Sequence, residues 1–234
     1  MTTSEITSAA DFGVPQAQLI AFLLFANGWG VERNHEKAHA YLQCAEDTGD
    51  PIAQYLGGVY YASRLCPFHN EAKAFQCYLV SAQQGFAPAQ HLVSACYQFG
   101  MGVELDNVSA FEWGLKAANL GFVPAQHNVA LMFYEGIGTA KDLQAAFNWN
   151  MEAARQGSPD GACQVAGMYE LGEGITRNEG EALKWYQEAS RVGSWMASGE
   201  LGRIYRFGRL GVARDDEKAI LYEQLSGALR PAIK

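Results

Sequence analysis

Apolar and small residues recur along this chain at helical spacing, in segments of about a dozen residues that end at glycine. The segment PAQHNVALMFYEG, residues 124–136, places one apolar stripe on a single helix face: Ala125, Val129, Met132 and Phe133. The segment LQAAFNWNMEAARQ, residues 143–156, carries a second stripe: Ala146, Trp149, Ala153 and Ala154. The pattern predicts two amphipathic helices joined by a short turn.

Residues that start and stop helices stand at the ends of both segments. Pro124 suits a helix start, where its missing N–H costs nothing, and Gly136 suits a helix end. Asp142 is placed to cap the second helix, which ends at Gly157. The related phrases GFAPAQ and GFVPAQ, at residues 85–90 and 121–126, therefore predict a helix stop, a turn and a new helix start.

This helix pair is repeated along the chain with a period of 36 residues. Glycines recur at that interval: Gly13, Gly49, Gly85, Gly121, Gly157 and Gly193. Alanines expected at helix contacts follow the same period: Ala38, Ala74, Ala110, Ala146 and Ala182, with Ala219 one residue late because GRLGV carries an insertion. A fixed period of this length predicts an all-α solenoid of stacked helix pairs.

We expect one domain over residues 1–234, in which residues 1–13 form a half-helix cap. The final second helix is expected to close the other end. The expected repeats are residues 14–49, 50–85, 86–121, 122–157, 158–193 and 194–227, followed by a carboxyl-terminal tail at 228–234.

The repeats resemble the Sel1-like repeat family, a relative of the tetratricopeptide repeat, over about residues 14–227. Two stretches carry the resemblance best: AQHNVALMFYEGIGTAKDLQAAFNWNMEAARQG and GACQVAGMYELGEGITRNEGEALKWYQEASRVG. The second repeat departs from the pattern, because Arg64 and Cys66 replace the glycines of its loop and predict a loop of different shape. The resemblance implies a right-handed α-solenoid of six helix-turn-helix repeats with capping helices.

The resemblance also implies a non-enzymatic, protein-binding role without catalytic residues or cofactors. Family members act as regulatory or assembly adaptors, and some bacterial members resemble immunity proteins that neutralise a toxin. Both roles stay open for this chain. The paired cysteines of the secreted branch of the family are absent here.

The composition of the chain limits the expected cellular location of the protein and the class of partner it binds. The net charge of −8 disfavours nucleic acid, and no apolar run is long enough to predict a membrane span. The five cysteines are irregularly spaced and no signal peptide is recognised, so we expect a cytoplasmic protein. The expected half-helix cap favours a monomer or a weak dimer.

The segment HEKAH, from His35 to His39, is the one motif that suggests catalysis. It matches the H-E-x-x-H pattern in which two histidines bind zinc and Glu36 serves as the base of a hydrolase. The repeat offers a different interpretation, since His39 takes the packing position of Phe147, and no third ligand follows. We expect no metal site here, and a zinc-dependent hydrolase is the alternative.

A second, weaker metal hypothesis concerns the altered loop of repeat two. Cys66, His69 and Cys77 lie around it, but a fourth ligand is not evident.

The expected partner-binding surface is the concave face formed by the first helices of the repeats. Its expected contact residues are Tyr55, His91, Gln98, Phe99, His127, Tyr134, Glu135, Arg203 and Arg206. Arg203 and Arg206 share a helix face. They suggest either a solvated end cap or a docking site for an acidic segment of a partner.

Overall fold

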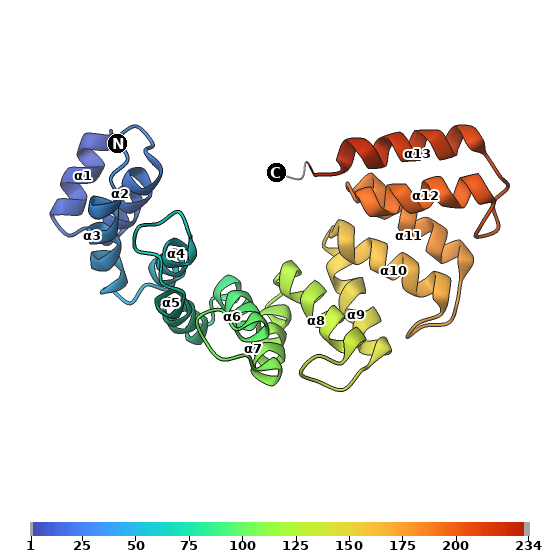
Figure 1. Cartoon of the computed structure of the whole chain (residues 1–234), viewed down its shortest axis with the longest axis horizontal. Coiled ribbons are helices and arrows are strands. Elements are labelled where there is room, and N and C mark those ends of the chain that lie inside the picture. The colour runs from blue at the N-terminus through green and yellow to red at the C-terminus, as the bar shows by residue number, and fades with distance from the viewer. Residues whose placement is uncertain (1, 232–234) are drawn as a thin grey trace. The chain divides into compact units, whose positions relative to one another are not determined.

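The computed structural model describes residues 2–231, which form α-helices and contain no strand. The helices are α1 (Thr3–Asp11), α2 (Pro15–Asn27), α3 (His35–Glu46), α4 (Pro51–Ala62), α5 (Glu71–Gln83), α6 (Ala87–Phe99), α7 (Asn107–Asn119), α8 (Val123–Glu135), α9 (Leu143–Arg155), α10 (Pro159–Leu171), α11 (Glu179–Arg191), α12 (Trp195–Phe207) and α13 (Asp216–Leu229) (Figure 1). The predicted all-α solenoid is confirmed. Residue 1 of the expected cap and residues 232–234 of the expected tail lie outside the described residues.

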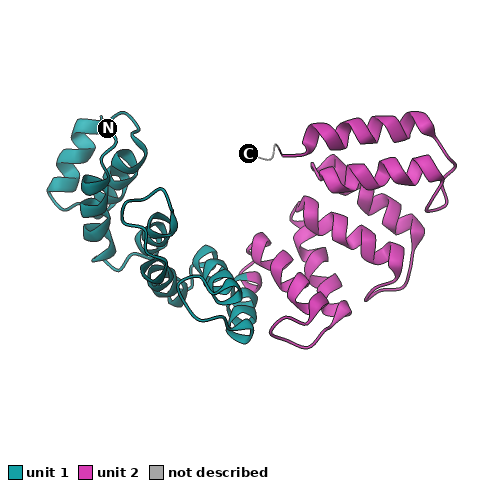
Figure 2. Ribbon diagram, in the orientation of Figure 1, with its two compact units in different colours: residues 1–117 teal, residues 118–234 magenta. Residues whose placement is uncertain are grey.

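Two compact units make up the chain, residues 1–117 and residues 118–234 (Figure 2). The first unit contains α1 to α6 and most of α7, and the second contains α8 to α13. A single domain and a right-handed superhelix stay predictions.

The first helix of each repeat starts and ends as its sequence predicts. Proline occupies one of the first two positions of α2, α4, α6, α8 and α10. Helices α2, α6, α8, α10 and α12 end at glycines in the left-handed conformation, which are Gly28, Gly100, Gly136, Gly172 and Gly208. Helix α4 is the exception, because it ends at Ser63 in an extended conformation. The predicted difference in the loop of repeat two is thus confirmed.

The second helix of each repeat begins at an asparagine or aspartate whose side chain accepts backbone N–H groups. These residues are Asn34, Asn70, Asp106, Asp142, Asn178 and Asp215. The backbone N–H of each also donates to the carbonyl of an aromatic residue in the first helix, as Asp142 does to Phe133 at 2.9 Å. This bond ties the loop to the helix that precedes it.

The insertion in repeat six leaves this bond in place. Asp215 still donates to the Tyr205 carbonyl, at 2.8 Å, although the loop is one residue longer. The buried Leu210 takes a left-handed conformation, with φ of 53°. The extra residue is therefore absorbed within the turn, and α12 and α13 pack as the other pairs do.

Small residues form the contacts between helices in both units. The periodic alanines are almost fully buried: Ala38, Ala74, Ala110, Ala146, Ala182 and Ala219. Aromatic and branched side chains fill the remaining space around them. Helix α1 packs on α2 and buries Ala10, and α13 packs on α12.

Candidate functional site

A hollow of about 300 Å³ lies on the second unit, between α8, α9 and α10, and we call it the α8–α10 hollow. Its lining residues are His127, Ala130, Leu131, Tyr134, Glu135, Asn150, Gln164 and Met168. Three of the side chains predicted to contact a partner, His127, Tyr134 and Glu135, therefore meet at one place. They do so because Tyr134 and Glu135 follow His127 by seven and eight residues, two helical turns, and so share one face of α8.

Two buried polar atoms of this hollow have no hydrogen-bond partner within residues 2–231. They are Oδ1 of Asn150, a residue only 5% exposed, and Nδ1 of His127. The amide nitrogen of Asn150 donates weakly to the Met168 sulfur, at 3.8 Å. A buried polar atom left unpaired costs about 1–3 kcal/mol, so both atoms are expected to lower the stability of the fold.

Tyr134 is held at the rim of the hollow by two contacts. Its hydroxyl donates to Oε2 of Glu173 at 2.8 Å, and this bond raises the pKa of Tyr134. The ammonium of Lys141 lies 5.0 Å from the centre of its ring. The neighbouring Glu135 is exposed. The rim thus presents an oriented aromatic ring and a carboxylate to solvent.

Four other predicted contact residues of the first helices lie in the first unit. Tyr55 is half-buried, with its ring 5.3 Å from that of Phe86, so it belongs partly to the packing. His91 is also half-buried, and burial lowers its pKa. Gln98 is half-buried, whereas Phe99 is 67% exposed. A partner-binding role for these four residues stays a prediction.

The arginines near the carboxyl end are paired with carboxylates of the same chain. Arg206 forms a bidentate ion pair with Glu223 of α13, and Arg209 pairs with Glu170 of α10. The remaining pairs are Arg191–Glu188, Arg203–Glu200, Arg209–Glu200 and Arg214–Asp216. Residues 191–214 contain all five of these arginines but one carboxylate, Glu200, so the other carboxylates come from outside this arginine-rich segment. Because these arginines are already paired, the pairing favours the solvated end cap over a docking site for an acidic segment of a partner.

The histidines of HEKAH contact tyrosines. The hydroxyl of Tyr60 donates to the backbone carbonyl of His35 at 3.2 Å. Nδ1 of His39 lies 3.3 Å from the hydroxyl of Tyr61, and its ring stacks on Phe68 with 4.1 Å between centroids. Burial, followed by the charge of Lys73, lowers the pKa of His39. His39 thus occupies the packing position that the repeat predicts.

The side chains of the second metal hypothesis have separate contacts. Cys66 accepts a hydrogen bond from the Phe68 amide at 3.3 Å, and Nδ1 of His69 lies 3.0 Å from the Tyr61 carbonyl. Cys77 donates to Glu46 at 3.5 Å. Across residues 2–231, no three or more histidine, cysteine, aspartate or glutamate side chains are grouped to hold a metal ion.

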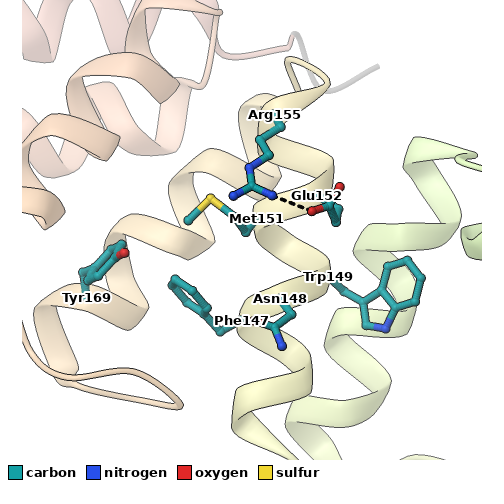
Figure 3. A pocket seen from close by; sticks show the side chains of 7 residues that line it. All are labelled: Phe147, Asn148, Trp149, Met151, Glu152, Arg155 and Tyr169. Carbon is teal, nitrogen blue, oxygen red and sulfur yellow. Dashed lines mark hydrogen bonds and ion pairs between the residues drawn. The ribbon is translucent and has the colours of Figure 1, made fainter.

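A second hollow on the same unit, of about 420 Å³, lies along α9 and α10 (Figure 3). The rings of Phe147 and Tyr169 meet edge to face there, 5.3 Å apart. Its polar groups are paired along their own helix, since Arg155 binds Glu152 at 2.7 Å and Asn148 accepts from Gln144 at 3.2 Å. Because the side chains of Asn148, Glu152 and Arg155 are already paired, the α8–α10 hollow is the stronger candidate for binding.

The lining residues that were not among the predicted contact residues are Ala130, Leu131, Asn150, Gln164 and Met168. Asn150 lies on the buried face of α9, where the period alone predicts core. The sequence signal that could have drawn attention to Asn150 is its polar side chain, because two other repeats carry tyrosine at this repeat position, Tyr78 and Tyr186.

Helix pairs that recur every 36 residues, pack through small side chains and end in capping helices define an α-solenoid repeat protein. The particular repeat follows from comparison with protein families. The Sel1 repeat model matches residues 15–50, 51–86, 87–122, 123–158, 159–194 and 196–226. The chain belongs to the Sel1 repeat family.

Solved structures share this fold. A protective antigen of uropathogenic Escherichia coli with an SLR fold matches 97% of this chain at 25% identity and a TM-score of 0.91. The chain covers 49% of that antigen, so it spans about half of its length. A Sel1 repeat protein from Oxalobacter formigenes matches 95% of this chain, and 88% of its own, at 26% identity and a TM-score of 0.82.

An immunity protein from Pseudomonas aeruginosa is similar in fold alone. It matches 92% of this chain and 81% of its own, at 19% identity and a TM-score of 0.58. Comparison with curated proteins gives no match. Within residues 2–231, none of the helices combines the length and the apolar character that crossing a membrane requires.

Proposed function

We propose that this chain is a non-enzymatic interaction module that binds a protein or peptide partner on the first-helix face of its repeats. Sel1 repeats mediate protein–protein interactions. The observation that carries the proposal is the α8–α10 hollow, which is lined by an oriented tyrosine, a histidine and a carboxylate from one helix. Aromatic side chains beside adaptable polar groups suit recognition surfaces.

Two biological roles fit such a module. A regulatory or assembly adaptor binds several partners weakly, whereas an immunity protein binds one toxin tightly and in fixed stoichiometry. The fold likeness to a Pseudomonas aeruginosa immunity protein makes the second role worth testing. We further expect a cytoplasmic monomer or weak dimer, which fractionation and sedimentation of the native protein would examine.

The proposal is tested by affinity capture from the native host with three forms of the tagged full chain. Wild type and the control variant Asn148→Ala, changed at an exposed position of α9, should capture the same partner. The double variant Tyr134→Ala, Glu135→Lys should lose it, because both rim side chains are removed or reversed. A partner retained equally by the double variant would contradict the site, and no partner above background would contradict the role.

A further inference from the structure

A groove of about 420 Å³ lies on the first unit between α2 and α4, and we call it the α2–α4 groove. Its apolar and cationic lining includes Leu23, Leu56, Val59, Leu65, Arg33 and His35. Val59 is 42% exposed and Leu65 is 91% exposed, so a group that enters the groove can reach both side chains. The groove therefore offers accessible apolar surface beside an arginine.

The altered loop of repeat two forms one wall of this groove. In repeat three the second loop glycine packs on the start of the preceding second helix, since a Cβ atom on Gly102 would lie 2.1 Å from the carbonyl oxygen of Glu71. Cys66 takes this glycine position in repeat two, and its side chain excludes the same close approach. The equivalent carbonyl, of His35, accepts a hydrogen bond from the hydroxyl of Tyr60 at 3.2 Å instead. Cys66 and His35 both line the groove, which thus lies where another repeat closes its loop onto the helix.

Arg33 lacks the carboxylate that neutralises its equivalents. In repeats five and six the arginine at this position pairs with a carboxylate two residues later, at 2.7 Å in Arg177–Glu179 and at 2.9 Å in Arg214–Asp216. In repeat one the position of that carboxylate is taken by His35. Across residues 2–231 no carboxylate forms an ion pair with Arg33, whose Nε donates to the Ala26 carbonyl at 3.1 Å. The guanidinium is thus held at the groove with its charge unpaired.

The charges around the groove leave this arginine available. Within the described chain, its lining contains no aspartate or glutamate. The nearest carboxylates in the sequence, Glu32 and Glu36, are exposed and do not pair with Arg33. The first unit carries more acidic than basic residues, but salt screens exposed charges beyond about 8–10 Å, so the arginine dominates at contact.

We propose that the α2–α4 groove binds an acidic segment of the partner, in which an apolar side chain stands beside a carboxylate. This inference rests on the proposed interaction role and names the chemistry of the segment that the first unit binds. The apolar side chain covers Val59 and Leu65. The carboxylate takes the place beside Arg33 that Glu179 holds beside Arg177, because a guanidinium presents paired N–H donors to a carboxylate.

The test uses three peptides with blocked ends. They are Asp-Leu-Leu-Asp, its neutral counterpart Asn-Leu-Leu-Asn, and Asp-Ser-Ser-Asp, which keeps the charges without the apolar side chains. Binding to the full chain is followed by NMR of methyl-labelled valine and leucine, with Val59 assigned from a Val59→Ile sample. We expect Asp-Leu-Leu-Asp to shift the Val59 resonance and to bind about fivefold more tightly than the neutral peptide, the factor of one exposed ion pair. Equal affinities of these two peptides, no shift at Val59, or an equal shift with Asp-Ser-Ser-Asp would overturn the proposal.

Two variants and one control locate the carboxylate. Arg33→Gln removes the charge, and His35→Glu supplies the carboxylate that repeat five carries at this position, so either variant should bind the two leucine peptides with nearly equal affinity. Arg177→Gln makes the same change at an arginine that is already paired with Glu179, and it should retain the preference for the acidic peptide. A preference that persists in Arg33→Gln and His35→Glu would contradict the assigned ion pair. Failure of the peptides with successful capture of a partner would remove this groove and leave the interaction role standing.

Discussion

The guanidinium of Arg206 on α12 binds both carboxylate oxygens of Glu223 on α13, with nitrogen–oxygen distances of 2.6 to 2.9 Å. The pair joins the last two helices, but its side chains are 38% and 44% exposed, so water screens the attraction. We expect Arg206→Ala to lower the free energy of unfolding by less than about 1 kcal/mol, and by less still at high salt.

Urea unfolding measures this change, and Arg203→Ala provides the control. Arg203 pairs with Glu200 within a single turn of α12 and is more exposed than Arg206, so its removal should cost about 0.3–0.5 kcal/mol or nothing measurable. A loss of several kcal/mol for Arg206→Ala would show instead that the pair holds α13 in place.

The alanine row of the second helices gives a test of packing. Ala146 is fully buried in the core of the second unit, where neighbouring helices leave room for a methyl group only. Ala146→Trp should overpack this contact and cost about 1–3 kcal/mol or more, which a lowered melting temperature would report. Asn148→Trp introduces the same side chain at an exposed position of α9 and should change stability by about 0.5 kcal/mol or less. The reverse ranking would mean that the faces of α9 are wrongly assigned.

The second glycine of the repeat loop is required by a close backbone contact. Gly174 has φ of +70°, and a Cβ atom built on it would lie 2.1 Å from the carbonyl oxygen of Leu143 in the preceding repeat. Gly174→Ala should therefore cost at least about 2 kcal/mol, since it adds both a strained conformation and a clash.

Another glycine of the same repeat supplies the matched control. Gly180 lies in the first turn of α11, and the nearest atom to an added Cβ there is 3.5 Å away, which is ordinary contact. Gly180→Ala should be neutral or stabilising by about 0.5 kcal/mol. Equal melting temperatures for the two variants would contradict the role of the Gly174 contact.

The helix ends could be predicted from the sequence because their causes are local. A left-handed glycine such as Gly136 and a cap such as Asp142 act within a few residues, so each copy of the repeat carries its own signal. The row of aspartate and asparagine caps could have been extended to all six second helices from the same period. The row of buried alanines could also be predicted, because it follows the 36-residue period of the repeat.

The candidate site could be predicted less well from the sequence, because it depends on side chains that lie far apart along the chain. Glu170 and Glu223 lie outside the arginine-rich segment, so their pairing with Arg209 and Arg206 follows only from the packing of neighbouring helices. Asn150 sits on a stripe that its period assigns to the core. The hollow beside it is formed by side chains of three different helices, and a hydrophobic pattern does not record such an arrangement.

The side chain of Glu46, at the end of α3, is half-buried against α4 and α5. Cys77 donates to its Oε1 at 3.5 Å, and a Cβ atom on Gly57 would lie 2.0 Å from the same oxygen. Burial raises the pKa of Glu46, an effect that exceeds the opposing hydrogen bond from Cys77 and the charge of Lys73. The folded state therefore favours the neutral carboxyl group, and ionisation at higher pH destabilises it.

The sign of the pH dependence follows from this shift. Below the ordinary glutamate pKa, Glu46 is protonated in both the folded and the unfolded chain, so it contributes no penalty. As the pH rises through the folded-state pKa, the unfolded chain ionises more readily and stability is lost. We expect Glu46→Gln, which keeps an acceptor for Cys77, to raise the melting temperature near neutral pH and to leave it unchanged near about pH 4.

Thermal melts of wild type and Glu46→Gln between about pH 4 and about pH 8 measure the difference directly. Glu36→Gln is the control, because Glu36 is exposed in the first turn of the same helix and its replacement should not give a pH-dependent gain. The same variant removes the one residue that a zinc hydrolase built on HEKAH would need as its base. A gain for Glu46→Gln that is equal at acid and neutral pH would mean that the variant acts through packing, and that the Glu46 carboxylate carries no desolvation penalty.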